Sequence, residues 1–267
     1  MVEGVQELGV VPEAERLSVT WVGHSTVLVE AAGVRLLTDP LLRPRLGHVR
    51  RVAPPVAPLE GELDAVLISH VHFDHLDVAS LRLVRARRIV VPRGARGIVE
   101  RRGLGPVVEL EEGEKLEIGG LSVQATHAVH SARRGLRSSA SVGYQVSAPA
   151  RVYFAGDTDV FEGMRGLAPL DVALLPIWGW GPRVGPGHLD PRGAAEALRL
   201  LQPRLAIPIH WGTYRRFGLS RDAAVLREPP ERFERLAREL APEVDVRILA
   251  PGERLALDAA ATQDVAP

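Results

Sequence analysis

Three histidines and an aspartate lie within six residues of the chain, in the segment Ser69-His70-Val71-His72-Phe73-Asp74-His75. The apolar run DAVLIS ends here, and the run LDVASLRLV, which we expect to begin a helix, follows. Side chains two residues apart on extended backbone point the same way, so His70 and His72 can bind one ion. The turn into the helix then presents Asp74 and His75 to a second position close by. A lone histidine is usually a hydrogen-bonded core or surface residue, but this density of ligands predicts a metal site.

The composition limits the chemistry of such a site. Among 267 residues there are nine histidines and no cysteine. The lack of cysteine excludes disulfides, thiolate nucleophiles and iron–sulfur clusters, so a transition metal must be bound by histidines and carboxylates. The 33 basic side chains balance 33 acidic ones, which argues against a nucleic-acid protein with a broad basic face.

The chain also lacks targeting signals. The stretch MVEGVQELGVVPEAER has neither the basic start nor the apolar core of a secretory signal. No run approaches the roughly 20 apolar residues of a membrane span. We therefore expect a cytoplasmic protein without a membrane span. The sequence contains no signal for its oligomeric state.

We expect a single domain over 1–267, with frayed ends at about 1–15 and 258–267. Asp190 as N-cap and Pro191 at the first helical position predict a helix through 194–201, and a second helix is expected at about 230–241. Strands and helices in this mixture predict an α/β or α+β layer architecture. Runs rich in Val, Ile and Leu predict the strands, at about 18–22, 26–31, 34–39, 65–70, 88–92, 121–127, 141–147, 151–157, 171–177 and 205–210.

Six motifs together resemble a known family. They are TWVGHSTVLVE, LLTDPLL, SHVHFDHLD, YFAGDTDVF, GHLDPRGAAEAL and PIHWGTY, and they span about residues 19–214. In this order they are similar to the metallo-β-lactamase superfamily, in the branch that contains N-acyl-phosphatidylethanolamine phospholipase D and L-ascorbate 6-phosphate lactonase. The resemblance implies a four-layer αββα sandwich with a dinuclear metal site on one edge, between its halves.

The resemblance also implies a ligand set. A first metal would be held by His70, His72 and His130, and a second by Asp74, His75 and His210, with Asp157 bridging the two. Local sequence agrees, because Asp157 and His210 each follow an apolar run and so lie at strand tips, where open α/β sheets place their sites.

The third ligand of the first metal has two candidates. The segment THAVHSARR offers both His127 and His130. The family pattern, a histidine followed by a small residue and then arginine, favours His130. His127 would then be a strand residue or a hydrogen-bonding neighbour of the ligands.

Three further residues match family positions near the metals. Asp39 in LLTDP corresponds to an aspartate that lies beside the metals without binding them, although it can also cap the turn before Pro40. His24 in WVGHST is expected to hydrogen-bond near the ligands. His188 is expected either to donate a proton or stabilise oxyanion charge, or to make only a structural contact in its Gly/Pro-rich loop.

Aromatic and basic residues suggest how a substrate is bound. Trp178, Trp180 and Trp211 fall in loops that should overhang the metals, where they would form an apolar wall or simply cover the sheet edge. Arg134 best matches a family position for recognising an anion.

These features predict metal-assisted hydrolysis. Two divalent ions bridged by a carboxylate lower the pKa of a water between them and polarise the substrate. We expect cleavage of an ester-like bond, foremost a phosphodiester in a small anionic substrate with an apolar part. A lactonase acting on a sugar or acyl-homoserine lactone would use the same chemistry. Zinc suits the ligands first, and manganese or iron are alternatives. A catalytically silent metal-binding regulatory module is the alternative from another functional class. Loss of catalysis usually removes metal ligands, whereas the full candidate set is present here.

Overall fold

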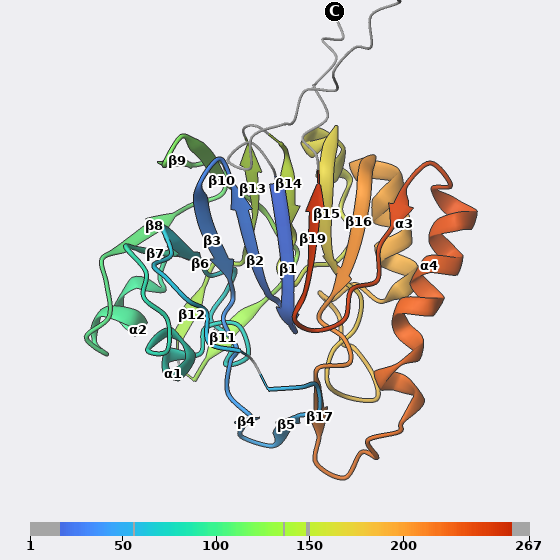
Figure 1. Cartoon of the computed structure of the whole chain (residues 1–267), viewed down its shortest axis with the longest axis horizontal. Helices are drawn as coiled ribbons and strands as arrows, with labels where there is room; N and C mark the ends of the chain where they lie inside the picture. Colours follow the sequence, from blue (N-terminus) through green and yellow to red (C-terminus); the bar gives the residue numbers. More distant parts are fainter. Residues whose placement is uncertain (1–16, 56, 136, 148–149, 258–267) are drawn as a thin grey trace, which may run out of the picture.

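Two seven-stranded sheets carry most of the apolar runs of the sequence (Figure 1). The computed structural model describes residues 17–55, 57–135, 137–147 and 150–257, and both ends expected to fray lie outside them. The first sheet has the order β19 (Glu253–Leu257), β1 (Leu17–Gly23), β2 (Thr26–Ala31), β3 (Val34–Thr38), β6 (Ala65–Leu67), β7 (Ile89–Pro92) and β8 (Val107–Leu110). The second has the order β18 (Asp245–Val246), β16 (Pro203–Ile209), β15 (Leu170–Pro176), β14 (Val152–Phe154), β13 (Val142–Ser147), β10 (Leu121–His127) and β9 (Lys115–Ile118).

The central strands are buried on both faces, which explains why their sequences are continuously apolar. In β15, Val172 and Leu174 pack into the core between the two sheets. Ala173 and Leu175, which alternate with them, pack against the helices outside. Strand β6 divides its side chains in the same way between the central core and the opposite outer layer.

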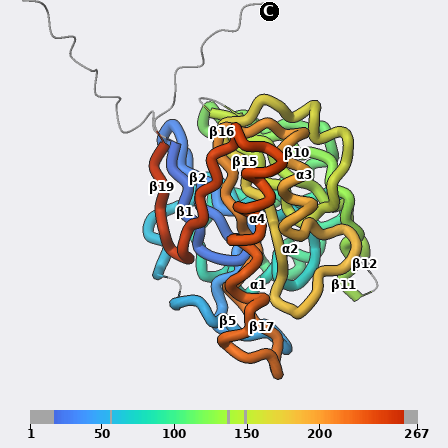
Figure 2. The backbone as a smooth tube through the Cα atoms, turned by 90° about the vertical axis from the view of Figure 1, so that its right-hand side faces the viewer, coloured from blue at the N-terminus to red at the C-terminus, as the bar shows by residue number. Residues whose placement is uncertain are grey.

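Helices cover the two outer faces. Figure 2 shows α3 (Pro191–Leu201) and α4 (Glu228–Leu240) over β15 and β16, with which they share a core. The short helices α1 (Val78–Leu81) and α2 (Arg96–Glu100) pack against the first sheet. Asp190 caps α3 as predicted, accepting hydrogen bonds from the backbone N–H of Arg192 and Gly193, and such a cap contributes about 1 kcal/mol. The order of layers is the predicted αββα.

Parallel strands bring the candidate site residues to one edge. Strands β3 and β6 are parallel in one sheet, and β14, β15 and β16 are parallel in the other. Their carboxyl ends therefore share an edge, and the segments that follow β3, β6, β14 and β16 carry Asp39, the 70–75 segment, Asp157 and His210.

The structure adds strands β8, β9, β18 and β19 of the large sheets and helix α2, which were not predicted, and it differs from the expected elements in two further places. The helix expected after residue 76 is reduced to the single turn α1. The N–H of Leu63 donates to the carbonyl of Arg85, and the N–H of Arg87 donates to the carbonyl of Leu63, which leads the chain into the next strand. Two small sheets were not predicted: β11 (Ala132–Arg134) with β12 (Arg137–Ser139), and β17 (Tyr214–Arg216) with β5 (Val49–Arg51) and β4 (Arg45–Leu46). Within the described residues, no helix is both long and apolar enough to cross a membrane.

Candidate metal centre

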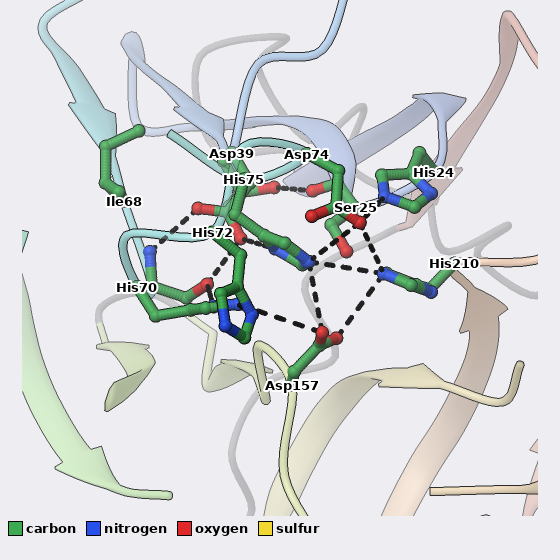
Figure 3. A network of polar contacts seen from close by, with 12 residues as sticks. His24, Ser25, Asp39, Ile68, His70, His72, Asp74, His75, Asp157 and His210 are labelled. Carbon is green, nitrogen blue, oxygen red and sulfur yellow. Dashed lines mark hydrogen bonds and ion pairs between the residues drawn. The ribbon is translucent and has the colours of Figure 1, made fainter. Parts of the chain in front are cut away.

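Side chains from four loops converge at the shared edge of the two sheets (Figure 3). The structure brings together all seven residues that the sequence predicts as ligands: His70, His72, Asp74, His75, His130, Asp157 and His210. They form two groups, each with donor atoms close enough to surround one ion.

The first group consists of His70, His72 and His130. Nδ1 of His72 lies 3.0 Å from Nε2 of His70 and 3.1 Å from Nε2 of His130. Three ring nitrogens that face one another at this distance are the arrangement in which neutral imidazoles bind a metal. The histidine that completes the group is His130, as the family pattern favours.

The second group consists of Asp74, His75 and His210. The Nε2 atoms of the two histidines are 3.2 Å apart. Oδ2 of Asp74 lies 3.8 Å from the first of them and 3.9 Å from the second. Two nitrogens and one carboxylate oxygen therefore face a common point.

Asp157 lies between the two groups. Its Oδ2 is 3.8 Å from Nε2 of His70 in the first group and 3.1 Å from Nε2 of His75 in the second. Its Oδ1 is 3.5 Å from Nε2 of His210, and this oxygen is buried without a hydrogen-bond partner in the structure. Buried carboxylate oxygens almost always have a partner, so this one fits a ligand to a cation.

The outward-facing nitrogens of three ligands are held by acceptors. Nδ1 of His75 donates to Oδ2 of Asp39 over 2.7 Å. Nδ1 of His130 donates to the carbonyl of Gly187 over 2.8 Å, and Nδ1 of His210 to that of Trp178 over 2.7 Å. Because the proton is fixed on Nδ1, the lone pair of Nε2 faces the cluster, as metal-binding histidines require.

Asp39 also reaches the first group through Ser69. The carboxylate accepts the backbone N–H of Ser69 at 2.7 Å and its hydroxyl at 2.5 Å. The hydroxyl oxygen in turn accepts Nδ1–H of His70 at 2.9 Å. One fully buried carboxylate therefore orients a histidine in each group.

His24 and Trp180 contact Asp74 from the other side. Nε2 of His24 donates to Oδ2 of Asp74 over 3.1 Å, and its ring lies 3.9 Å from that of His210. Nε1 of Trp180 donates to the same oxygen over 3.0 Å. Both contacts fix the direction in which Asp74 presents its carboxylate.

The electrostatics favour a cation. Burial lowers the pKa of His130 to about 4, and burial followed by the neighbouring His210 lowers the pKa of His24 to about 4, so both rings are neutral at pH 7. Burial opposes charge on Asp74 and Asp157, but nearby histidines outweigh it and hold the pKa of each carboxyl well below its usual value. Burial likewise opposes charge on His75, but the carboxylates around it raise its pKa well above its usual value.

The ionised carboxylates, and the imidazoles whose pKa is lowered, fit divalent metal ions, which would replace the proton that the carboxylates favour on His75. The donor set of nitrogen and oxygen atoms suits zinc, manganese and iron alike. The residues present therefore match the group that the resemblance implies.

His188 faces the cluster from the loop that precedes α3. Its Nε2 lies 3.4 Å from Oδ2 of Asp157, and 28% of its side chain is exposed. Its Nδ1 lies 3.2 Å from the carbonyl of Gly185 and 3.1 Å from that of Pro186. Burial opposes the charged ring, but the hydrogen bond with Asp157 outweighs burial and raises the pKa of His188.

Of the two roles left open for His127, the structure supports the strand residue and not the neighbour of the ligands. His127 is the last residue of β10, and its exposed side chain pairs with Glu112, with Nδ1 2.8 Å from Oε2. The side chain instead lines an open cavity of about 580 Å³ that also includes Phe161. Alternation along β10 directs the ring away from the cluster.

Of the two roles expected for Trp211, the structure supports the cover of the sheet edge and not the wall of a substrate site. Its ring stacks on that of the fully buried Trp21, with centroids 5.0 Å apart, and its Nε1 donates to the carbonyl of Pro208. It packs against both cores that flank the second sheet, so it covers the sheet edge.

Trp178 and Arg134 make contacts within the chain. Nε1 of Trp178 donates to the carbonyl of Gly181 over 3.1 Å, in the loop beside the cluster. The guanidinium of Arg134 donates to the carbonyl of Leu76 over 2.6 Å and lies 4.1 Å from the ring centroid of Phe73. Arg134 therefore braces the ligand-bearing 70–75 segment.

Sequence reasoning missed three contributions. Ser69 connects His70 to Asp39, and its position directly before the first ligand is the only signal in the sequence. The carbonyl of Gly187 orients His130, and no sequence pattern indicates such a backbone contact. Trp180 was expected to supply an apolar surface, but it supplies a hydrogen-bond donor.

Comparison with known proteins decides the family. The model of the beta-lactamase superfamily domain matches residues 34–211. The chain belongs to this superfamily. It is 33% identical over 254 residues to a metal-dependent hydrolase of Rubrobacter xylanophilus, across 89% of this chain and 95% of that protein. It is 34% identical over 229 residues to N-acyl-phosphatidylethanolamine-hydrolyzing phospholipase D 1 of Caenorhabditis elegans, across 74% of this chain and 64% of that protein.

A solved structure agrees with the fold. The metallo hydrolase Igni18 of the hyperthermophilic archaeon Ignicoccus hospitalis matches with a TM-score of 0.70 at 24% identity, across 91% of this chain and 99% of that one. The predicted superfamily and fold are therefore confirmed, and so is the prediction of a metal-dependent hydrolase.

Proposed function

We propose that this superfamily member is a dinuclear hydrolase that cleaves an ester-like bond, foremost a phosphodiester. The observation that carries the proposal is the position of Asp157, whose carboxylate reaches nitrogens of both ligand groups. A carboxylate in this position can bridge two cations. His70, His72 and His130 would hold one ion, and Asp74, His75 and His210 the other. Zinc is our first assignment, with manganese or iron as alternatives.

The chain's own residues hold and orient the ions. When bound, two divalent ions activate a water as nucleophile and polarise the bond to be cleaved. Asp39 keeps a proton on Nδ1 of His75, so that Nε2 stays available. His24 and Trp180 hold the carboxylate of Asp74 in place. No side chain is needed as a covalent nucleophile.

His188 is the residue that we propose moves a proton. Its Nε2 faces Asp157, its ring is partly accessible, and its raised pKa favours the protonated form near neutral pH. A protonated imidazole at the rim of the cluster can donate to a leaving group or stabilise oxyanion charge.

The substrate proposed is a small anion with an apolar part. The similarity to a phospholipase D of Caenorhabditis elegans, whose name describes hydrolysis of a phosphodiester lipid, supports a phosphodiester. Trp178 and Trp180, in the loop beside the cluster, supply aromatic surface next to the candidate ligands. A lactone remains the alternative substrate, because the same ligand set serves both reactions.

The test compares two substrates in one assay. Zinc-loaded protein should hydrolyse bis(p-nitrophenyl) phosphate faster than an acyl-homoserine lactone at equal concentration. Asp74→Ala should lose at least about 100-fold in kcat/KM, whereas the exposed control Asp245→Ala should match the wild type. Equal rates for wild type and Asp74→Ala would overturn the assignment, and faster turnover of the lactone would replace the phosphodiester.

A further inference from the structure

The small sheet of β4, β5 and β17 forms a basic face beyond the edge that carries the metal centre. Figure 1 shows these strands projecting below the two large sheets, and Figure 2 shows the same from the side. The segments 43–51 and 214–221 that build it contain seven arginines and no aspartate or glutamate. We call the exposed residues Arg45, Arg50 and Phe217 the arginine face.

Arginines stand directly opposite one another across this sheet. Arg45 pairs in register with Arg50, and Arg50 pairs with Arg215 on the next strand. Like charges on opposed residues of neighbouring strands are destabilising. Such a row is typical of a surface that meets negative charge from outside the chain.

Within the described residues, the exposed arginines of this face lack a carboxylate partner, as do some exposed arginines elsewhere, such as Arg232 and Arg235. They differ from those in standing opposite one another across a small sheet. On other surfaces, arginines such as Arg96, Arg192 and Arg238 each pair with a glutamate on the same helix or segment. Since the arginines of the arginine face form no such pair among the described residues, their charge is free to attract an anion.

Phe217 lies among these arginines with 44% of its surface exposed. The guanidinium carbons of Arg45 and Arg50 lie 4.9 and 5.6 Å from its ring centroid. The backbone N–H of Phe217 donates to the carbonyl of His48, which fixes the ring over the sheet. An apolar ring surrounded by guanidinium groups suits an interface where apolar chains meet anionic headgroups.

The arginine face is connected to the metal centre. The backbone N–H of Arg216 donates to the carbonyl of Trp180 over 3.0 Å, and the ring of His48 lies 5.0 Å from that of Trp180. Trp180 is the residue that donates to Asp74. A surface that docks on this face would therefore adjoin the loop beside the candidate ligands.

We propose that the arginine face docks the protein on an anionic lipid membrane. The occupant is a surface of phosphate-bearing headgroups, because unpaired arginines recognise phosphate and Phe217 would enter the apolar boundary beneath it. Single-stranded RNA fits less well, since guanidinium groups already lie against the ring that a base would stack on.

Vesicle binding tests the docking and does not depend on hydrolysis or on the proposed function. Full-length protein is sedimented with phosphatidylcholine vesicles with and without phosphatidylglycerol. We expect binding only to the anionic vesicles, weakening as salt is raised. Arg45→Glu with Arg50→Glu should weaken binding by at least about 30-fold, since each arginine near an anionic surface contributes roughly 5-fold. Phe217→Ser should weaken it without changing the charge.

A matched variant controls for net charge. Arg232→Glu with Arg235→Glu alters the net charge by the same amount, but on the exposed surface of α4, and should leave most of the vesicle binding intact. Equal loss in both double variants, or no binding of the wild type to anionic vesicles, would overturn the proposal. Binding to single-stranded RNA that vesicles do not compete away would also overturn it. If the double variant does not fold, as judged by circular dichroism, Phe217→Ser decides alone.

Discussion

The indole Nε1 of Trp180 donates to Oδ2 of Asp74 over 3.0 Å. Asp74 is a candidate ligand of the second metal, and Trp180 comes from a loop of the other half of the sandwich. Hydrogen-bond partners that orient a metal ligand in this way typically contribute about 10- to 100-fold to metal affinity. The contact therefore couples the loop after β15 to the second metal position.

Replacing Trp180 by phenylalanine should weaken that position selectively. Trp180→Phe keeps an aromatic ring but removes the N–H. We therefore expect the affinity for the zinc ion held by Asp74, His75 and His210 to fall about 10-fold. Isothermal titration of chelator-treated protein measures this. The control is Trp178→Phe, whose N–H bonds only to Gly181. Unchanged affinity in Trp180→Phe would show that the hydrogen bond does not orient Asp74.

Asp39→Asn should lower metal affinity without removing a candidate ligand. The amide retains the size of the carboxylate but loses the charge that holds the protons of His75 and, through Ser69, of His70. We expect a loss of roughly 10- to 100-fold in zinc affinity, measured by competition with a chromophoric chelator. The surface variant Asp245→Asn serves as control, and identical affinities in the two variants would contradict the orienting role.

His130 and His127 make a matched pair within one segment. His130→Ala should lose about half of the bound metal, because it removes a ligand of the first group. His127→Ala should retain all of it, because that exposed ring pairs with Glu112. Elemental analysis of both purified variants gives the answer. A full metal content in His130→Ala, with loss in His127→Ala, would reverse the assignment.

The candidate ligand set comes from the resemblance to the metallo-β-lactamase superfamily, and the structure brings those residues together. Backbone geometry explains part of their spacing. His70 and His72 are two residues apart at a strand end, and Asp157 and His210 each follow an apolar strand, so the parallel strand order brings them to one edge. The same reasoning predicts the central strands, since both of their faces are buried and their apolar runs are unbroken.

Other features depend on contacts that no local pattern encodes. The two roles open to Trp211 could not be separated from the sequence, because its stacking partner, Trp21, lies in the other sheet. The hydrogen bond from Trp180 to Asp74 requires a loop whose path follows from backbone contacts with the small sheet. That sheet escaped prediction because its strands have only two or three residues and pair segments far apart in the chain.

Acid should destabilise the metal-free protein. In the folded chain the pKa of His24 and that of His130 are both about 4, whereas the pKa of an unfolded histidine is about 6.5. Between these values the unfolded state binds more protons, so the free energy of unfolding decreases as the pH falls from about 6.5 toward 4. His75 and His188, whose pKa values are raised in the folded chain, act in the opposite direction near the upper end of this range, where an unfolded histidine is only partly protonated.

Thermal unfolding of chelator-treated protein measures the effect. We expect Tm to fall across this pH range, and to fall less in His24→Gln, which lacks one of the buried titrating groups. His127→Gln, which changes an exposed ring, should follow the wild type. A Tm that is constant or that rises as the pH falls would contradict the expected protonation states.

The most direct test of the dinuclear hydrolase is a metal titration followed by activity on the same sample. Chelator-treated protein receives zinc in steps while bound metal and hydrolysis of bis(p-nitrophenyl) phosphate are recorded together. We expect saturation at two ions per chain, no turnover before metal is added, and full turnover only when the second ion binds. Saturation at two ions should be lost in Asp157→Ala. Full activity in protein that retains no metal, or saturation at a single ion, would contradict the account.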